Sequence, residues 1–121
     1  MVEQPILDLS RLGDKKYRDW YNGAFLTWSI AAQVRDKRLA LNWTIKILAE
    51  KSGLHWATIR RVESGKTLKF SNRTLLKIAG AFDCALVVKF VCWEDFIAIV
   101  LAFTPDGLVV ESFDTLEQLV R

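Results

Sequence analysis

Apolar residues recur at helical spacing in the chain that follows an irregular arm over residues 1–14. The apolar side chains of the first such stretch are three and four residues apart, which places them on one face of an α-helix: Tyr17, Trp20, Tyr21, Ala24 and Trp28. The pair Asn22-Gly23 is typical of a turn, so we predict a break there and a second helix over about residues 24–41. The basic residues of this second helix are expected to point largely outward: Arg35, Lys37 and Arg38.

The stretch from residue 44 to residue 64 has the pattern of two short helices. Thr44 is a good N-cap for a helix that ends near Ser52. Gly53 can adopt the left-handed conformation that ends this helix and turns the chain sharply. His55 begins a second helix, which stops at Ser64-Gly65. Two helices of this length joined by a glycine turn predict a helix-turn-helix.

A further helix is predicted after Ser71 or Asn72, with a continuous apolar stripe up to Phe82. Residues 86–92 are β-branched and aromatic and predict a strand. Residues 93–103 are apolar almost throughout, so their pattern fits a helix or a strand equally well. After them the pattern predicts a proline-glycine turn at 104–107, a strand over 108–113 and a capped helical turn from Asp114.

The composition is that of one compact globular domain. The chain has 121 residues, of which 51% are hydrophobic and 26% charged. We see no signal peptide, and the longest apolar run, Phe96 to Phe103, is too short to span a bilayer. The two cysteines, Cys84 and Cys92, are interpreted as small apolar core residues, with redox sensing as an alternative. We therefore expect a cytoplasmic protein without membrane contact.

Charge is distributed unevenly along the chain. Residues 33–77 hold eleven lysines and arginines and three acidic residues, a net charge of +8, whereas residues 78–121 have a net charge of −5. A basic middle with an acidic, apolar end is typical of a polyanion-binding segment attached to a second functional part. The alternative is a set of solvated, lysine-rich helix faces.

The ordered motifs from residue 33 onward resemble the lambda-repressor/Cro-type (XRE-family) helix-turn-helix proteins. The resemblance covers about residues 25–83 and rests on four stretches that follow one another as in that family: Gln33–Thr44, Leu48–Leu54, Ile59–Lys66 and Thr74–Phe82. It implies a mainly α fold, a lambda-repressor-like bundle. We divide the chain into the arm 1–14, a DNA-binding domain 15–83 with its helix-turn-helix at about 44–64, and a strand-containing extension 84–121.

In this family the second helix of the motif, here about residues 55–63, lies in the major groove of DNA. The resemblance assigns base readout to its outward residues: Trp56, Ala57, Arg60 and Arg61. An arginine can form a bidentate pair with guanine, and apolar side chains can contact a thymine methyl group. Ile45 and the pair Trp56-Ala57 depart from the polar residues that are usual in the family. Packing of Trp56 against the first helix is the alternative for that residue.

Flanking polar and basic residues are candidates for phosphate contacts: Arg35, Thr44, Lys46, His55, Thr58, Lys66, Thr67, Lys69, Asn72 and Arg73. Each lysine taken singly could equally be a solvated surface charge. Together they predict affinity for DNA that falls steeply with salt.

No catalytic or metal-binding pattern is present in the sequence. His55 has no carboxylate or cysteine at ligand spacing, and no nucleophile elbow or glycine-rich phosphate loop occurs. We predict neither an enzyme nor a cofactor.

The extension after residue 83 is unusually apolar. From Cys84 to Phe103, seventeen of twenty residues are apolar or aromatic. Such a surface is typical of a protein interface, and we predict a homodimer. The expected interface residues are Leu86, Val88, Phe90, Trp93, Phe96 and Ile97. The alternative is that the extension folds back on its own domain.

The sequence therefore predicts a homodimeric, sequence-specific DNA-binding regulator, most simply a repressor of bacterial or phage type that reads an inverted repeat. A second hypothesis is an antitoxin whose C-terminal part neutralises a toxin while its basic domain autoregulates the operon. A third is a helix-turn-helix that makes protein contacts only.

Overall fold

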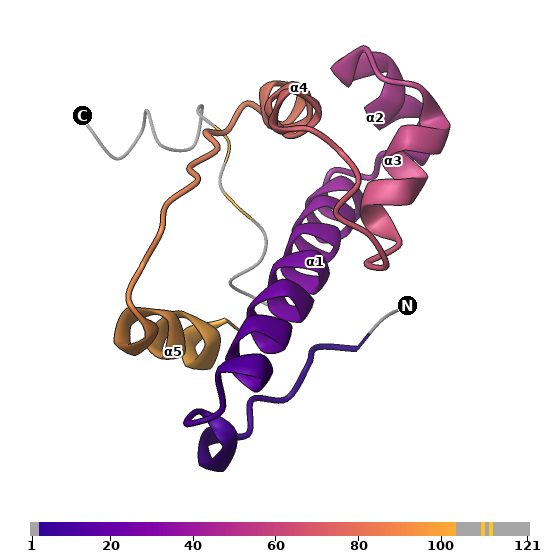
Figure 1. The fold of residues 1–121 in the computed structure, drawn as a ribbon. Coiled ribbons are helices and arrows are strands. Elements are labelled where there is room, and N and C mark those ends of the chain that lie inside the picture. Colours follow the sequence, from indigo (N-terminus) through magenta and orange to yellow (C-terminus); the bar gives the residue numbers. More distant parts are fainter. Residues whose placement is uncertain (1–2, 104–109, 111, 113–121) are drawn as a thin grey trace, which may run out of the picture.

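The computed structural model describes residues 3–103, 110 and 112, and this part of the chain is helical (Figure 1). A 3-10 turn at Leu9–Arg11 precedes five α-helices in the described residues: α1 at Lys15–Ala40, α2 at Ile45–Ser52, α3 at Trp56–Glu63, α4 at Asn72–Phe82 and α5 at Trp93–Ala102. None of the helices in that part is long and apolar enough to cross a membrane.

The first helix, α1, runs without interruption through Asn22 and Gly23, so the predicted break is wrong. Tyr21 and Phe25, on either side of this pair, are buried. A glycine inside a helix costs only about 1 kcal/mol relative to alanine. Burying one phenylalanine contributes about 1.5–3 kcal/mol, which outweighs that cost.

The C-terminal half of α1 packs with α2, α3 and α4 around one apolar core. Leu48 from α2 and Ile59 and Val62 from α3 are fully buried there. Gly53, between α2 and α3, has φ of 70° and ψ of 25°, the left-handed conformation expected of it. The helix-turn-helix bundle predicted from the sequence is confirmed.

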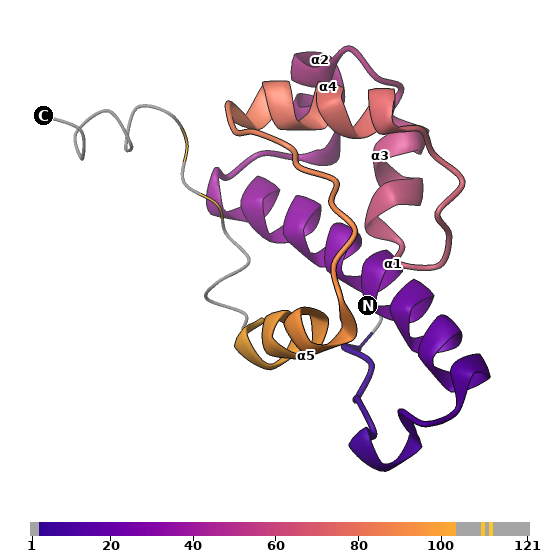
Figure 2. The same cartoon turned by 60° about the vertical axis from the view of Figure 1, so that its left-hand side comes forward.

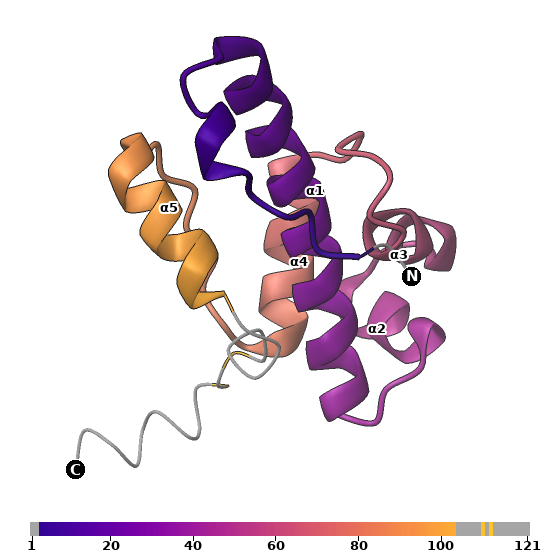
Figure 3. The same cartoon turned by 90° about the horizontal axis from the view of Figure 1, so that it is seen from below.

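The N-terminal half of α1 belongs to a second, largely aromatic core, formed with the arm and with α5. Its buried members are Tyr17, Tyr21, Phe25, Phe96 and Val100. The rings of Phe25 and Phe96 meet edge to face with centroids 5.4 Å apart. Figures 1 and 3 show α5 beside this half of α1, on the other side of α1 from α2 and α3.

The arm is more ordered than its pattern predicts, because two buried tyrosines hold it. Tyr21 Oη donates a 2.8 Å hydrogen bond to the Pro5 carbonyl, and the Asp8 amide donates a 2.8 Å bond to Tyr17 Oη. Burial, and then the neighbouring Tyr17, raises the pKa of Tyr21 above its usual value. The Tyr21 hydroxyl thus remains a donor to the arm.

Residues 93–103, ambiguous in the sequence, form α5 up to Ala102. Phe96 and Val100, one turn apart, are buried against α1, whereas Ile99 and Leu101 are exposed. Glu94 and Asp95 occupy the first turn, where the helix dipole favours negative charge. The helix therefore has one buried face. This face cannot be recognised from the sequence, because almost all residues of the helix are apolar.

The predicted strand at 86–92 is wrong for the single chain: these residues contain no strand ladder to any other described residue. They cross instead from the end of α4 to the start of α5 (Figure 2). The turn predicted at 104–107, the strand at 108–113 and the helical turn from Asp114 lie outside the described residues, apart from positions 110 and 112.

The two cysteines differ in environment. Cys84 is half-buried, and desolvation, partly offset by Lys37, raises the pKa of its thiol. Cys92 is exposed at the N-cap of α5, so its interpretation as a core residue is wrong.

Candidate nucleic-acid interface

The outer face of α3 carries the four residues predicted to read bases. Ile59 and Val62 are buried on the inner face, which turns the opposite face of the helix toward solvent. Trp56, Ala57, Arg60 and Arg61 are all exposed on that outer face. We call these four residues the α3 face. Two residue pairs on it are spaced one helical turn apart, each an apolar residue followed by an arginine: Trp56 with Arg60 and Ala57 with Arg61.

Trp56 is a surface residue at the start of α3. Its side chain is 44% exposed, and it is not among the residues that pack against the core of the bundle. The guanidinium carbon of Arg60 lies 5.7 Å from the centroid of its ring, within the range of a cation–π contact. The structure therefore supports the exposed position of Trp56 over packing against α1.

The start of α3 is capped by a histidine. His55 Nδ1 accepts a 3.1 Å hydrogen bond from the Ala57 amide, which satisfies one of the free donors of the first turn. The cap holds the backbone next to Trp56 and Ala57 in helical geometry. His55 has the structural role expected from its position, and its side chain is exposed.

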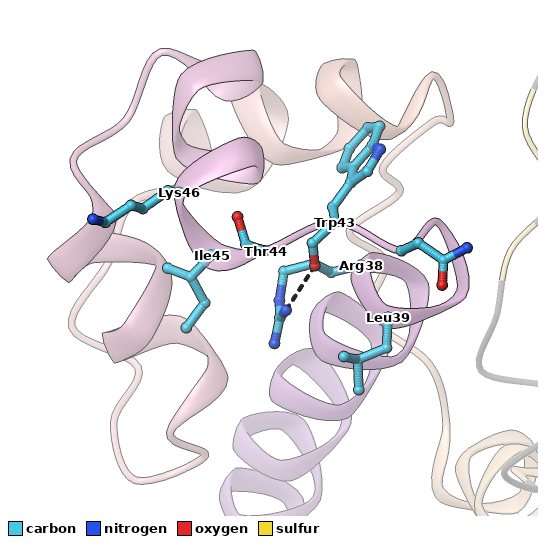
Figure 4. Close-up of a pocket in the computed structure, with 7 residues that line it drawn as sticks. Arg38, Leu39, Trp43, Thr44, Ile45 and Lys46 are labelled. Carbon is cyan, nitrogen blue, oxygen red and sulfur yellow. Dashed lines mark hydrogen bonds between the residues drawn. The ribbon is translucent and has the colours of Figure 1, made fainter.

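The end of α3 is tied to α1 by an almost buried ion pair. Arg38 Nε and Nη2 donate to the two carboxylate oxygens of Glu63 at 2.8 and 2.9 Å. Arg38 Nη1 donates a third bond, of 2.9 Å, to the Trp43 carbonyl (Figure 4). One guanidinium thus connects α1, the chain before α2 and the end of α3, and so sets the orientation of the α3 face.

Arg38 and Lys37 were expected to point outward, and for both residues this expectation is wrong. Lys37 is only 6% exposed. Its Nζ donates a 3.0 Å bond to Ser112 Oγ, which in turn donates a 3.1 Å bond to the Phe82 carbonyl. The buried Val34 lies three and four positions before these residues, so helical spacing alone places them near the inner face.

The start of α2 is open to solvent. A shallow depression of about 620 Å³ lies there and is lined by Arg38, Leu39, Asn42, Trp43, Thr44, Ile45 and Lys46 (Figure 4). Thr44 Oγ1 accepts a 3.1 Å bond from the Ile47 amide, which caps the helix. The amides of the first turn and the exposed Lys46 together favour an anion at this end.

The predicted phosphate contacts after α3 are mostly at the surface. Lys66 and Lys69 are exposed in the loop before α4, and Asn72 and Arg73 are exposed in its first turn. Thr67 is half-buried, and its Oγ1 accepts a 3.0 Å bond from the Lys69 amide.

Two other candidates for phosphate contacts, Arg35 and Thr58, are less accessible. Arg35 Nε lies 3.1 Å from Asp36 Oδ1 and its side chain is 20% exposed, so its charge is already paired. Thr58 is half-buried in α3.

The predicted dimer residues fall into two groups. Val88 and Phe90 are exposed and Leu86 is half-buried, all on the segment between α4 and α5. Trp93 and Ile97, on α5, are half-buried, and Phe96 is buried in the aromatic core. Part of the extension thus folds back on its own chain, and Phe96 is buried there with only 9% of its surface exposed.

Residues 34–88, from the last turns of α1 to the segment that follows α4, match a family model described as helix-turn-helix. The match supports a helix-turn-helix domain similar to those of the lambda-repressor/Cro type. No curated protein and no solved structure matches the chain. Domains of this family bind double-stranded DNA in transcription regulators, and the α3 face is on the helix that occupies the recognition position.

Proposed function

We propose that the protein is a sequence-specific transcriptional regulator that acts as a homodimeric repressor. The observation that carries this proposal is the α3 face: two arginines and two apolar side chains, all exposed, on the second helix of a helix-turn-helix domain. No chemical step belongs to this function. Occupation of operator DNA would itself exclude the polymerase.

The α3 face supplies the two kinds of contact that base readout requires. Arg61 and Arg60 each have a fork of donors that matches the O6 and N7 atoms of guanine. Trp56 and Ala57 offer apolar surface to a thymine methyl group. The contact of Arg60 with the Trp56 ring limits the freedom of that guanidinium before DNA arrives.

The surrounding basic residues would hold the phosphates on either side of the groove. Lys66 and Lys69 follow α3, Arg73 begins α4 and Lys46 begins α2, and all four are exposed. Such contacts position the protein without reading sequence. We therefore assign affinity mainly to these residues and specificity to the α3 face.

The test separates these two roles on one duplex that the protein prefers and one that it does not. Arg61→Ala should weaken binding to the preferred duplex by about 1–3 kcal/mol and leave the other nearly unchanged. The double variant Lys66→Ala/Lys69→Ala should weaken both duplexes alike and reduce the slope of log K against log salt by about 0.9 per lost contact. Fluorescence anisotropy titrations measure both quantities.

Lys15→Ala is the matched control, because Lys15 is an exposed basic residue on α1 that pairs with Asp19. It should leave both affinities unchanged. Equal loss on both duplexes with Arg61→Ala would contradict base readout by that residue.

An antitoxin role remains the second candidate function. The observation that favours it is the exposed apolar segment between α4 and α5, because a partner protein would cover it as well as a second copy would. Stable co-purification with a second small protein at fixed stoichiometry would support this role. A homodimer that purifies alone would favour the repressor.

A further inference from the structure

The ring of Trp56, the first residue of α3, is held in place by two other side chains. The ring centroids of His55 and Trp56 are 5.4 Å apart, and the guanidinium carbon of Arg60 lies 5.7 Å from the Trp56 centroid. His55 is itself fixed, because its Nδ1 accepts the hydrogen bond from the Ala57 amide. Trp56 nevertheless remains 44% exposed. Its ring is therefore an ordered apolar surface that loses little side-chain entropy when a ligand binds to it.

The position of Trp56 on α3 determines what this surface meets in a complex with DNA. In a helix-turn-helix, the N-terminal residues of the second helix contact base edges in the major groove. The apolar group that these edges present is the C5 methyl group of thymine. 5-Methylcytosine carries the same methyl group at the same ring position. Trp56, at the first position of α3, therefore suits a pyrimidine with a C5 methyl group.

Arg60 supplies the polar half of the same contact. Its guanidinium can donate two hydrogen bonds to O6 and N7 of a guanine. Successive base pairs are about 3.4 Å apart along the duplex. The 5.7 Å between the guanidinium carbon and the Trp56 centroid is longer than one such step and shorter than two. The two side chains therefore match a guanine and a pyrimidine on neighbouring base pairs.

We propose that Trp56 and Arg60 together read a 5-methylpyrimidine beside a guanine, so that cytosine methylation at this step strengthens binding. This inference rests on the proposed function, because it specifies which base step the α3 face reads. Thymine meets the requirement in unmodified DNA, and 5-methylcytosine meets it in methylated DNA. Ala57, one turn before Arg61, offers only a single methyl group, so we assign the dependence on the methyl group to Trp56.

The test compares duplexes that differ by one methyl group. The native chain first selects a preferred duplex from a random pool of unmodified DNA, and we expect thymine beside guanine in each half-site. In the first pair of probes, this thymine is either kept or replaced by deoxyuridine. In the second pair, a cytosine paired with guanine takes its place and is either unmethylated or 5-methylated. Each pair retains every hydrogen-bonding group, and fluorescence anisotropy titrations measure the affinities.

In both pairs the methyl group should raise the affinity of the native chain about fourfold per half-site, the effect of burying one methyl group. Trp56→Ala should bind the two members of each pair equally. This variant should fold, because Trp56 is not among the residues that pack against the core of the bundle. Arg61→Ala is the matched control on the same exposed face. It should weaken binding to all four probes and retain the fourfold ratio.

A further probe tests the part assigned to Arg60. The guanine beside the thymine is replaced by 7-deazaguanine, which pairs normally but lacks the N7 acceptor. This change should weaken binding of the native chain and have no effect on Arg60→Ala. An equal loss in the two proteins would show that another residue contacts this guanine.

The failure of this inference can be distinguished from the failure of the proposed function. Equal affinities of the native chain within either pair would overturn the methyl readout, as would selected half-sites without thymine beside guanine. A fourfold ratio that persists in Trp56→Ala would overturn the role of Trp56. In each of these cases the enriched motif would leave sequence-specific binding in place. A pool from which no motif is enriched would instead refute the proposed function, and this inference with it.

Discussion

One guanidinium group, that of Arg38, makes three hydrogen bonds that join three parts of the helix-turn-helix domain. The side chains of Arg38 and Glu63 are only 11% and 8% exposed, so both charges are largely removed from water. A pair of this kind costs free energy to desolvate, and this cost is recovered only while both partners remain. The pair therefore contributes more to the orientation of α3 than to net stability.

Loss of one partner should therefore be costly. Glu63→Ala leaves the Arg38 charge nearly buried and uncompensated, and we expect the free energy of unfolding to fall by about 3–5 kcal/mol. The apolar double variant Arg38→Met/Glu63→Leu should lose less than Glu63→Ala alone. Urea unfolding followed by circular dichroism measures both.

Lys15→Ala is the control, because it breaks an ion pair whose side chains are 75% and 65% exposed. Exposed pairs contribute at most about 1 kcal/mol, so its effect should be small. A loss with Glu63→Ala no larger than that of the control would contradict the account of the buried pair.

The inward positions of Arg38 and Lys37 show where residue-level prediction fails. Charged residues are almost always exposed, so a basic residue next to the inner face is assigned to solvent by default. Both exceptions depend on distant partners, Glu63 on α3 and Ser112 beyond α5. The α3 face, in contrast, follows from local periodicity alone, which is why all four of its residues are at the surface as expected.

At the scale of elements, two glycines have opposite roles. Gly53 ends α2 at φ of 70°, where a side chain is strained although no atom lies within 4 Å of an added Cβ. Gly23 is inside α1 and also has open space around it. Only Gly53 has a backbone conformation that favours glycine over other residues.

The two alanine variants should therefore change stability in opposite directions. Gly53→Ala should lower the free energy of unfolding by about 1–2 kcal/mol, because alanine resists the left-handed conformation. Gly23→Ala should raise it by about 0.5–1 kcal/mol, because alanine favours the helix interior. Thermal unfolding of the two variants beside the native chain checks this, and stabilisation by Gly53→Ala would refute the role given to the turn.

The contrast between local signals and tertiary packing explains which elements could be predicted from the sequence. The short helices α2 and α3 could be predicted because their caps and the glycine turn between them are local signals. The continuity of α1 and the helical state of 93–103 depend on the aromatic core between them, which no local window contains. The absence of a strand ladder at 86–92 in the described chain also depends on tertiary structure, because a β-strand forms only beside a neighbouring strand.

At the scale of the whole molecule, the described residues form two separate apolar cores. One holds the helix-turn-helix domain, and the other packs the arm, the first half of α1 and α5 on the far side of α1. The net charge is +8 over residues 33–77, most of the helix-turn-helix domain, and −5 over residues 78–121, which include α5. In the function that we propose, the basic part of the chain binds the polyanion.

The most direct test is selection of bound duplexes from a random DNA pool at two salt concentrations. We expect an enriched inverted repeat whose half-sites are about ten base pairs, or roughly 34 Å, apart. The enrichment should persist at the higher salt while total binding falls. Salt-sensitive binding with no enriched motif would contradict sequence-specific recognition of DNA, because it would leave a basic surface without readout by α3.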